Sequence, residues 1–157
     1  MVEKKFTASI DKVYELLTDP KWLEKRCLDL GEISAAVKAK KTAKGATVSM
    51  QREVKREVSG MVGKVLPKQG SITIEETWSP DGEGHSGALV MELVGLPVKI
   101  SGEITLTVEG KGCKYAIQHK AKCSVPLVGG AVEKFVMGEL EKGAADELDY
   151  LAKALKK

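Results

Sequence analysis

Three ionisable side chains, Arg52, Glu76 and His119, stand where predicted strands otherwise carry apolar residues. In the alternating pattern of a half-buried strand, each of them would point toward the interior. A charge in that position costs free energy unless it is paired or hydrogen-bonded. One interpretation is structural: Arg52 pairs with Glu76, or the strand ends reach solvent. The other is that these polar groups orient a ligand held mainly by apolar contacts, the usual construction of small-molecule pockets.

His119 and Glu76 are also the residues from which an acid–base pair could be assembled. A cyclase- or hydratase-like reaction would need them within hydrogen-bond reach of each other. A single histidine on an apolar face is, however, more often a satisfied core residue than a catalyst or a ligand contact. The chain has no GxSxG, HExxH or GxxxxGK[ST] motif, and its two histidines, His85 and His119, cannot supply a three-histidine metal site. We therefore expect no enzymatic activity, no metal and no cofactor, and keep the enzyme as an alternative.

Length, charge and cysteine content narrow the class of protein. With 157 residues the chain is expected to form one domain, residues 1–157. Its 25 basic and 22 acidic residues are interleaved and only 4% of its residues are aromatic, which disfavours a nucleic-acid partner. Three cysteines without CxxC spacing, and an N-terminal segment without the apolar core of a signal peptide, predict reduced thiols and a cytoplasmic location.

The N-terminal thirty residues predict a strand followed by two short helices. Residues 2–8 alternate between apolar and polar side chains, as a strand does. Ser9 is placed to cap a helix over residues 10–17. Asp19 followed by proline is a second helix start, and the helix over residues 20–30 stops at a glycine.

Residues 32–125 read mainly as about six strands, with the clearest alternation over residues 98–109. Residues 60–70 are apolar but lack a period of two, so they predict a short helix or loop. Alternation with short turns favours an antiparallel sheet that is covered on one face. The covering element is predicted by the last thirty residues, whose apolar positions recur every three or four residues from Val128 to Leu155.

The middle of this long helix is thin. Gly138 and Gly143 lie inside it, although glycine in a helix costs about 1 kcal/mol relative to alanine. Two interpretations stay open for this region: close packing of the helix against the sheet, or space kept for a ligand between them.

With this order of elements, the chain resembles a known group of proteins, the START-like superfamily. It is also called the Bet v 1-like, SRPBCC or helix-grip superfamily. The similarity spans essentially the whole chain and looks closest to an uncharacterised bacterial-type branch, so no catalytic residue is carried over. The segments that carry it are "LLTDPKWLEKRC", "TIEETW", "GLPVKISGEITL" and, most specifically, "VPLVGGAVEKFV" leading into "ELEKGAADELDYL".

The resemblance implies an α+β helix-grip fold. A curved antiparallel sheet of about seven strands, with two short helices after the first strand, would wrap around the long C-terminal helix. It also implies a cavity between sheet and helix, suited to a lipid, a sterol, a polyketide-like compound or another small hydrophobic molecule. The function expected is the binding or carrying of such a ligand.

The candidate cavity residues combine apolar wall positions with the three polar groups. They are Met50, Arg52, Ile74, Glu76, Trp78, Met91, Ile104, Tyr115, Ile117, His119, Phe135, Val136 and Leu140.

The expected partner is the small hydrophobic molecule, without stable insertion into a membrane, since no apolar run approaches the length of a span. Transient membrane contact and an unidentified protein partner stay open. A further alternative is a ligand-free interaction module that uses "GMVGKVLP" as its contact. Burial of Met61, Val65 and Leu66 over a cavity mouth would instead indicate a lid.

Overall fold

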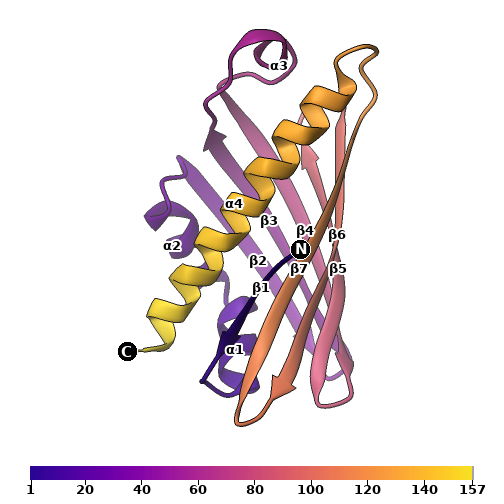
Figure 1. The fold of residues 1–157 in the computed structure, drawn as a ribbon. Helices are drawn as coiled ribbons and strands as arrows, with labels where there is room; N and C mark the ends of the chain where they lie inside the picture. Colours follow the sequence, from indigo (N-terminus) through magenta and orange to yellow (C-terminus); the bar gives the residue numbers. More distant parts are fainter. Residues whose placement is uncertain (157) are drawn as a thin grey trace.

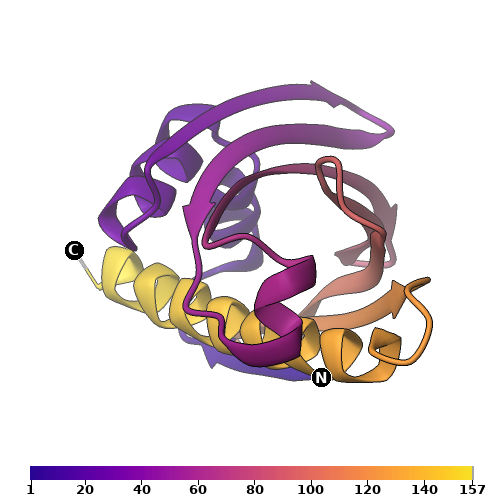
Figure 2. The same ribbon diagram turned by 90° about the horizontal axis from the view of Figure 1, so that it is seen from above.

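The protein, a computed structural model that describes residues 1–156, contains one antiparallel sheet and four helices. The strands follow the spatial order β1-β7-β6-β5-β4-β3-β2, so each strand from β2 onward pairs with its successor and β1 closes against the last strand. Figure 2 shows the sheet curving into an arc, with α4 crossing its open side. The strands are β1 (Val2–Phe6), β2 (Ser34–Thr42), β3 (Gly45–Lys55), β4 (Gln69–Asp81), β5 (Gly84–Leu93), β6 (Val98–Glu109) and β7 (Gly112–Cys123).

The helices begin and end where local capping dictates. Ser9 accepts a hydrogen bond from the backbone N–H of Lys12 and caps α1 (Ile10–Leu17). Asp19 caps α2 (Pro20–Asp29), which starts with proline at its first position. The backbone leaves this helix through Gly31, whose positive φ of 97° favours glycine. The remaining helices are α3 (Gly60–Val65) and α4 (Gly129–Leu155).

Helix α4 lies diagonally along the concave side of the sheet and packs mainly on β7 and β1 (Figure 1). Its buried side chains follow one winding stripe that includes Val132, Val136, Ala144 and Leu148. Inward-facing residues of all seven strands form the core together with this stripe. These observations confirm the predicted α+β fold with a curved antiparallel sheet and a long C-terminal helix. The short helix or loop predicted for residues 60–70 is α3 with the turn that follows it.

The junction between β7 and α4 is held by close backbone packing. A Cβ atom on Gly129 would come within 2.9 Å of the carbonyl oxygen of Cys123, so the helix start approaches the strand end too closely for a side chain. Leu127, two residues earlier, has a positive φ of 70° and a fully exposed side chain. An apolar residue held in this backbone region without burial is unusual, because leucine avoids it on steric grounds.

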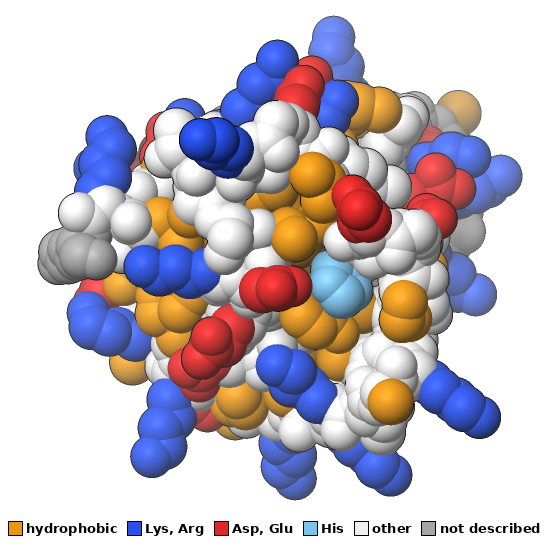
Figure 3. Space-filling view, turned by 90° about the horizontal axis from the view of Figure 1, so that it is seen from below, with side chains coloured by type: hydrophobic (Ala, Val, Ile, Leu, Met, Phe, Trp, Pro, Cys, Tyr) orange, Lys and Arg blue, Asp and Glu red, His pale blue; other side chains and the backbone are white. Residues whose placement is uncertain are grey.

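The end of the molecule opposite α3 is closed by α1. Tyr14 of α1 stacks on His85 with ring centroids 3.7 Å apart, and its edge meets Trp78 at 5.9 Å. Figure 3 shows this end, where acidic and basic side chains are intermingled around apolar ones. The interior therefore has a packed end at α1 and a less filled end toward α3.

Candidate functional site

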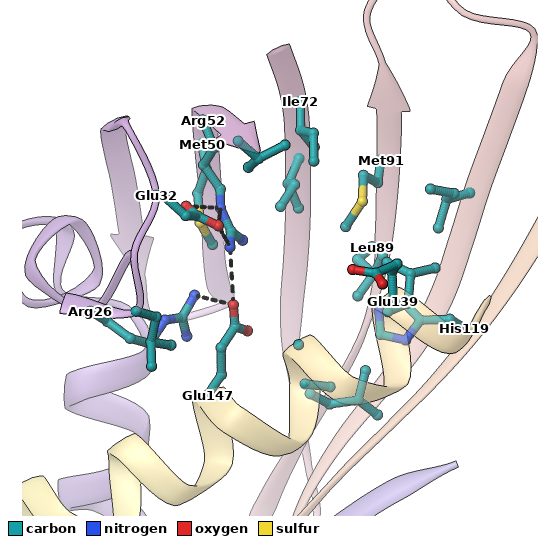
Figure 4. A pocket seen from close by; sticks show the side chains of 18 of the residues that line it. Arg26, Glu32, Met50, Arg52, Ile72, Leu89, Met91, His119, Glu139 and Glu147 are labelled. Atoms are coloured by element: carbon teal, nitrogen blue, oxygen red, sulfur yellow. Dashed lines mark hydrogen bonds and ion pairs between the residues drawn. The ribbon is translucent and has the colours of Figure 1, made fainter. Parts of the chain in front are cut away.

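A cavity of about 290 Å³ lies between the concave face of the sheet and α4. Most of its wall is apolar. Arg26, Glu32, Arg52 and Glu147 gather where α2, β3 and α4 approach one another, whereas His119 and Glu139 lie on the opposite side (Figure 4). Gly143 and Ala144 form part of the helix wall, and a Cβ built on Gly143 would meet nothing within 4 Å. The thin middle of the helix therefore borders open space at Gly143.

The structure brings eleven of the thirteen predicted site residues together around this cavity. They are Met50, Arg52, Ile74, Glu76, Met91, Tyr115, Ile117, His119, Phe135, Val136 and Leu140. That any of them contacts a ligand stays a prediction.

Trp78 and Ile104 do not line the cavity. They are 1% and 0% exposed and lie in a packed layer just beyond it. Both pair with Gly87, one row beyond that of Glu76. Ile117 of β7 pairs with Ile104 in the same row but does line the cavity. Trp78 and Ile104 thus face the interior, as predicted, but they do not reach the cavity because α1 fills this end of the interior.

The predicted pair between Arg52 and Glu76 does not form. Arg52 donates from Nε to Glu32 Oε1 at 2.7 Å, and its Nη2 contacts both Glu32 and Glu147, the latter at 3.2 Å. Arg26 Nη2 lies 3.5 Å from the same Oε2 atom of Glu147. Figure 4 shows Glu147 of α4 between the two guanidinium groups, with Arg26 on α2 and Arg52 on β3. We call Arg26, Glu32, Arg52 and Glu147 the ion cluster.

Mutual pairing keeps the ion cluster charged. Burial alone would raise the pKa of Glu147, but the adjacent Arg26 and Arg52 outweigh it and hold the pKa below its usual value. Burial likewise opposes the charge of Arg52, yet Glu147 and Glu32 raise its pKa. Arg26 is 6% exposed and depends on Glu147 in the same way. Two positive and two negative charges therefore compensate one another at the edge of the cavity.

Glu76 lies outside this compensated set. Burial raises its pKa to about 7, a shift that Arg26 and Arg52 oppose and Glu147 reinforces. Its side chain forms part of the cavity wall. The indole N–H of Trp78 lies near the carboxyl group of Glu76 and also lowers its pKa. It does not form a hydrogen bond of normal geometry with that group. Near neutral pH, Glu76 therefore exists in both protonation states.

Glu76 and His119 share one row of the sheet but do not meet. Glu76 pairs with Leu89, Leu89 with Gly102, and Gly102 with His119, so three strand spacings of about 4.8 Å separate them along the sheet. No hydrogen bond joins the two side chains in the described part of the chain. Burial lowers the pKa of His119, which favours the neutral imidazole. The convergence that an acid–base pair requires is absent from this arrangement.

Sequence reasoning missed three members of the ion cluster: Arg26, Glu32 and Glu147. Two of them carried a usable signal. Arg26 follows the buried Leu23 by three residues, and Glu147 follows the buried Ala144 by three, so both lie on apolar helix faces. Glu32 lies in the turn after α2, and its sequence position gave no comparable indication.

The segment around α3 combines features of a lid and of an open surface. Leu66 is 1% exposed and lines the cavity, and Val65 packs against the core. Met61 is 59% exposed. The burial that would indicate a lid therefore occurs for only some of these residues.

Within residues 1–156, no group of three or more His, Cys, Asp or Glu side chains is placed to hold a metal ion. The three cysteines are free and buried, and burial raises the pKa of Cys27 to about 11. The most prominent chemical feature of this site is thus the ion cluster, with Glu76 beside it, at one side of a mainly apolar cavity.

Comparisons with known proteins add a family but no activity. The model of a family described as "Protein of unknown function (DUF2505)" matches residues 1–155. No curated protein matches the sequence.

Several solved structures share the fold at low sequence identity. TTHA0849 from Thermus thermophilus is 19% identical with a TM-score of 0.66, over 97% of this chain and 92% of that one. Ms6760 from Mycobacterium smegmatis is 15% identical with a TM-score of 0.59, over 98% and 88%. A conserved protein from Geobacillus kaustophilus is 14% identical with a TM-score of 0.58, over 98% and 92%. At these identities the likeness shows the fold alone.

Proposed function

The chain belongs to the DUF2505 family of proteins of unknown function, and from its own geometry we propose that it binds or carries a small, mainly hydrophobic molecule. The observation that carries this proposal is the mostly apolar cavity of about 290 Å³ beneath α4. Such a lining with a few convergent polar groups is the usual form of a small-molecule site. The sheet and helix arrangement is also compatible with membership in the START-like superfamily.

The size of the cavity restricts the ligand. Its volume of about 290 Å³ lies at the small end of the range of about 300 to 1,000 Å³ that is usual for ligand pockets. A molecule with a short alkyl chain or one or two rings fits this volume, whereas a complete sterol or phospholipid is larger. We therefore favour a small lipid-like or polyketide-like compound. A binding role is favoured over catalysis because His119 and Glu76 lie three strands apart.

Filling the cavity from α4 tests this proposal. A Gly143→Leu variant should bind alkyl ligands at least tenfold more weakly, or about 1.4 kcal/mol, because the new side chain occupies the open space beside Gly143. Binding is measured by the thermal shift with medium-chain alkyl compounds and by native mass spectrometry.

Gly138→Leu is the matched control. It makes the same change in the same helix, at an exposed position that does not line the cavity. Equal binding by both variants, or no binding of any alkyl compound by the unmodified protein, would contradict the proposal.

We also propose that ligand exchange occurs at an anionic membrane surface, through the end of the molecule that carries α3. Three exposed apolar side chains lie in separate connections at this end: Met61, Val94 and Leu127. Exposed lysines flank them, among them Lys64 and Lys68, which suits an anionic surface. No helix within residues 1–156 is long and apolar enough to cross a membrane.

Leu127→Gly should reduce binding to phosphatidylglycerol vesicles severalfold without reducing stability. Leucine is disfavoured at the observed φ of 70°, so glycine should leave the free energy of unfolding unchanged or raise it by about 1 kcal/mol. Vesicle co-sedimentation measures the first effect and urea denaturation the second. Val108→Ser, which removes an exposed apolar side chain at the opposite end, is the control. Unchanged vesicle binding by Leu127→Gly would contradict the proposal.

A further inference from the structure

The cavity wall formed by β4 and β5 is polar at one depth and apolar at the next. Along β4 the inward residues are Ile72, Ile74 and Glu76, and the register pairs the first two with Leu93 and Met91 on β5. Glu76 pairs with Leu89, and the following row is packed with Trp78. On β4 and β5 the apolar rows lie toward α3, and Glu76 lies at the floor nearest the closed end. On β3 the row of Ile72 carries Arg52, and Lys55, Arg56 and Glu139 also line the cavity. We call Glu76, Arg26 and Tyr115 the polar floor, since all three line the cavity.

A buried donor at this floor has no hydrogen-bond partner. Within residues 1–156, Arg26 Nε is buried and unpaired, in a residue that is 6% exposed. Buried donors are nearly always hydrogen-bonded, so an unpaired one in a cavity wall favours a ligand that supplies an acceptor. Arg26 lines the cavity, so this donor is within reach of a bound molecule.

The charges at the floor favour an acceptor without charge. Both guanidinium groups are already compensated by Glu32 and Glu147. An anionic head would add a third negative charge beside Glu147 and Glu76, whereas a cationic head would meet Arg26 and Arg52. The groups facing Glu76 are Arg26 of α2, Arg52 of β3, Tyr115 of β7 and Glu147 of α4. A neutral hydroxyl or carbonyl group can accept from Arg26 Nε without disturbing this balance.

We propose that the polar floor binds the uncharged head of an amphiphile, a hydroxyl or carbonyl group, while its alkyl chain lies toward α3 along the apolar wall formed by β4 and β5. The head accepts from Arg26 and, when it is a hydroxyl, donates to the Glu76 carboxyl group. This assignment rests on the proposed ligand-binding function and adds the class of head group. The raised pKa of Glu76 agrees with it, because the floor already resists one uncompensated negative charge.

Three probes of equal chain length test the head-group assignment: 1-octanol, octanoate and octylamine. Their affinities for the unmodified protein are measured by titration calorimetry at pH 6 and pH 8. We expect 1-octanol to bind roughly tenfold more tightly than either charged probe at pH 6. Octanoate should lose up to about another tenfold between pH 6 and pH 8, as the fraction of neutral Glu76 falls. In a Glu76→Gln variant this loss for octanoate should disappear.

The outcomes separate the head-group assignment from the proposed function. Equal affinities for all three probes, or tightest binding of octanoate, would overturn the polar floor while leaving alkyl binding in place. Absence of binding by every probe would overturn both. An Arg26→Met variant should lose the preference for 1-octanol, and preserved preference in a folded variant overturns the role of Arg26. If that variant does not fold, the pH dependence in Glu76→Gln still decides, because glutamine keeps the size and neutrality of the protonated side chain.

Discussion

A Glu76→Gln variant is expected to be more stable than the unmodified protein at pH 8 by roughly 2 to 3 kcal/mol, and nearly equal to it at pH 4.5. The reason is that burial raises the pKa of Glu76 from 4.5 to about 7 in the folded state. Between these two values the unfolded chain releases a proton that the folded chain still holds. The free energy of unfolding therefore falls as the pH rises from about 4.5 to 7, and stays low above it. Glutamine resembles the protonated side chain and removes this loss.

Urea denaturation at pH 4.5, 6 and 8 measures the effect. Glu75→Gln is the matched control, because Glu75 is the exposed neighbour on the outer face of the same strand. The control should change the free energy of unfolding little at any of the three pH values. If Glu76→Gln is equally or less stable than the unmodified protein at pH 8, then the negative charge of Glu76 is compensated in the folded state. The assignment of an uncharged head group to the polar floor is then wrong. A residue that destabilises its own fold at neutral pH is typical of a functional site.

The fold was predictable because local and global signals in this chain agree. Ser9, Asp19 and Gly31 mark helix ends by capping chemistry, and the structure confirms each of them. Alternation along 98–109 depends only on one covered face of the sheet, and it survives in the observed burial of β6. These features are set by neighbours in the sequence, so they can be inferred without knowing which strands pair.

The site was predictable only in part, because its charged residues pair with partners that are distant in the sequence and are brought together by the fold. Arg52 was correctly placed at the interior, but its partners come from the α2–β2 turn and from α4, 20 and 95 positions away. The pattern within a strand cannot identify such partners, so the interpretation that paired Arg52 with Glu76 is wrong. Trp78 was predicted to face inward and is buried. It does not line the cavity, however, because α1 packs against it and fills this end of the interior.

Glu147→Gln is expected to destabilise the protein by about 3 kcal/mol at pH 7, because it leaves two buried guanidinium groups without their shared counter-charge. The pKa of Glu147 is lowered in the folded state, so its stabilising charge is present above the unfolded pKa and is lost as the pH falls through the folded one. The difference between variant and unmodified protein should therefore shrink in acid. Urea denaturation at pH 7 and at pH 3 measures both results.

Glu141→Gln supplies the control, since Glu141 is exposed on the same helix and the change in charge is identical. A loss below about 1 kcal/mol for Glu147→Gln would mean that the ion cluster is no stronger than a surface pair.

Glu147→Gln should also show how α4 is held over the cavity. The helix packs on β7 and β1 at one edge of the sheet, whereas Glu147 connects it to α2 and β3 on the opposite side. Without this connection, hydrogen exchange should become faster in the C-terminal half of α4 than in β6 and β7, because local opening requires less free energy there. Uniform acceleration across the chain would contradict this role and would indicate that Glu147 contributes only to global stability.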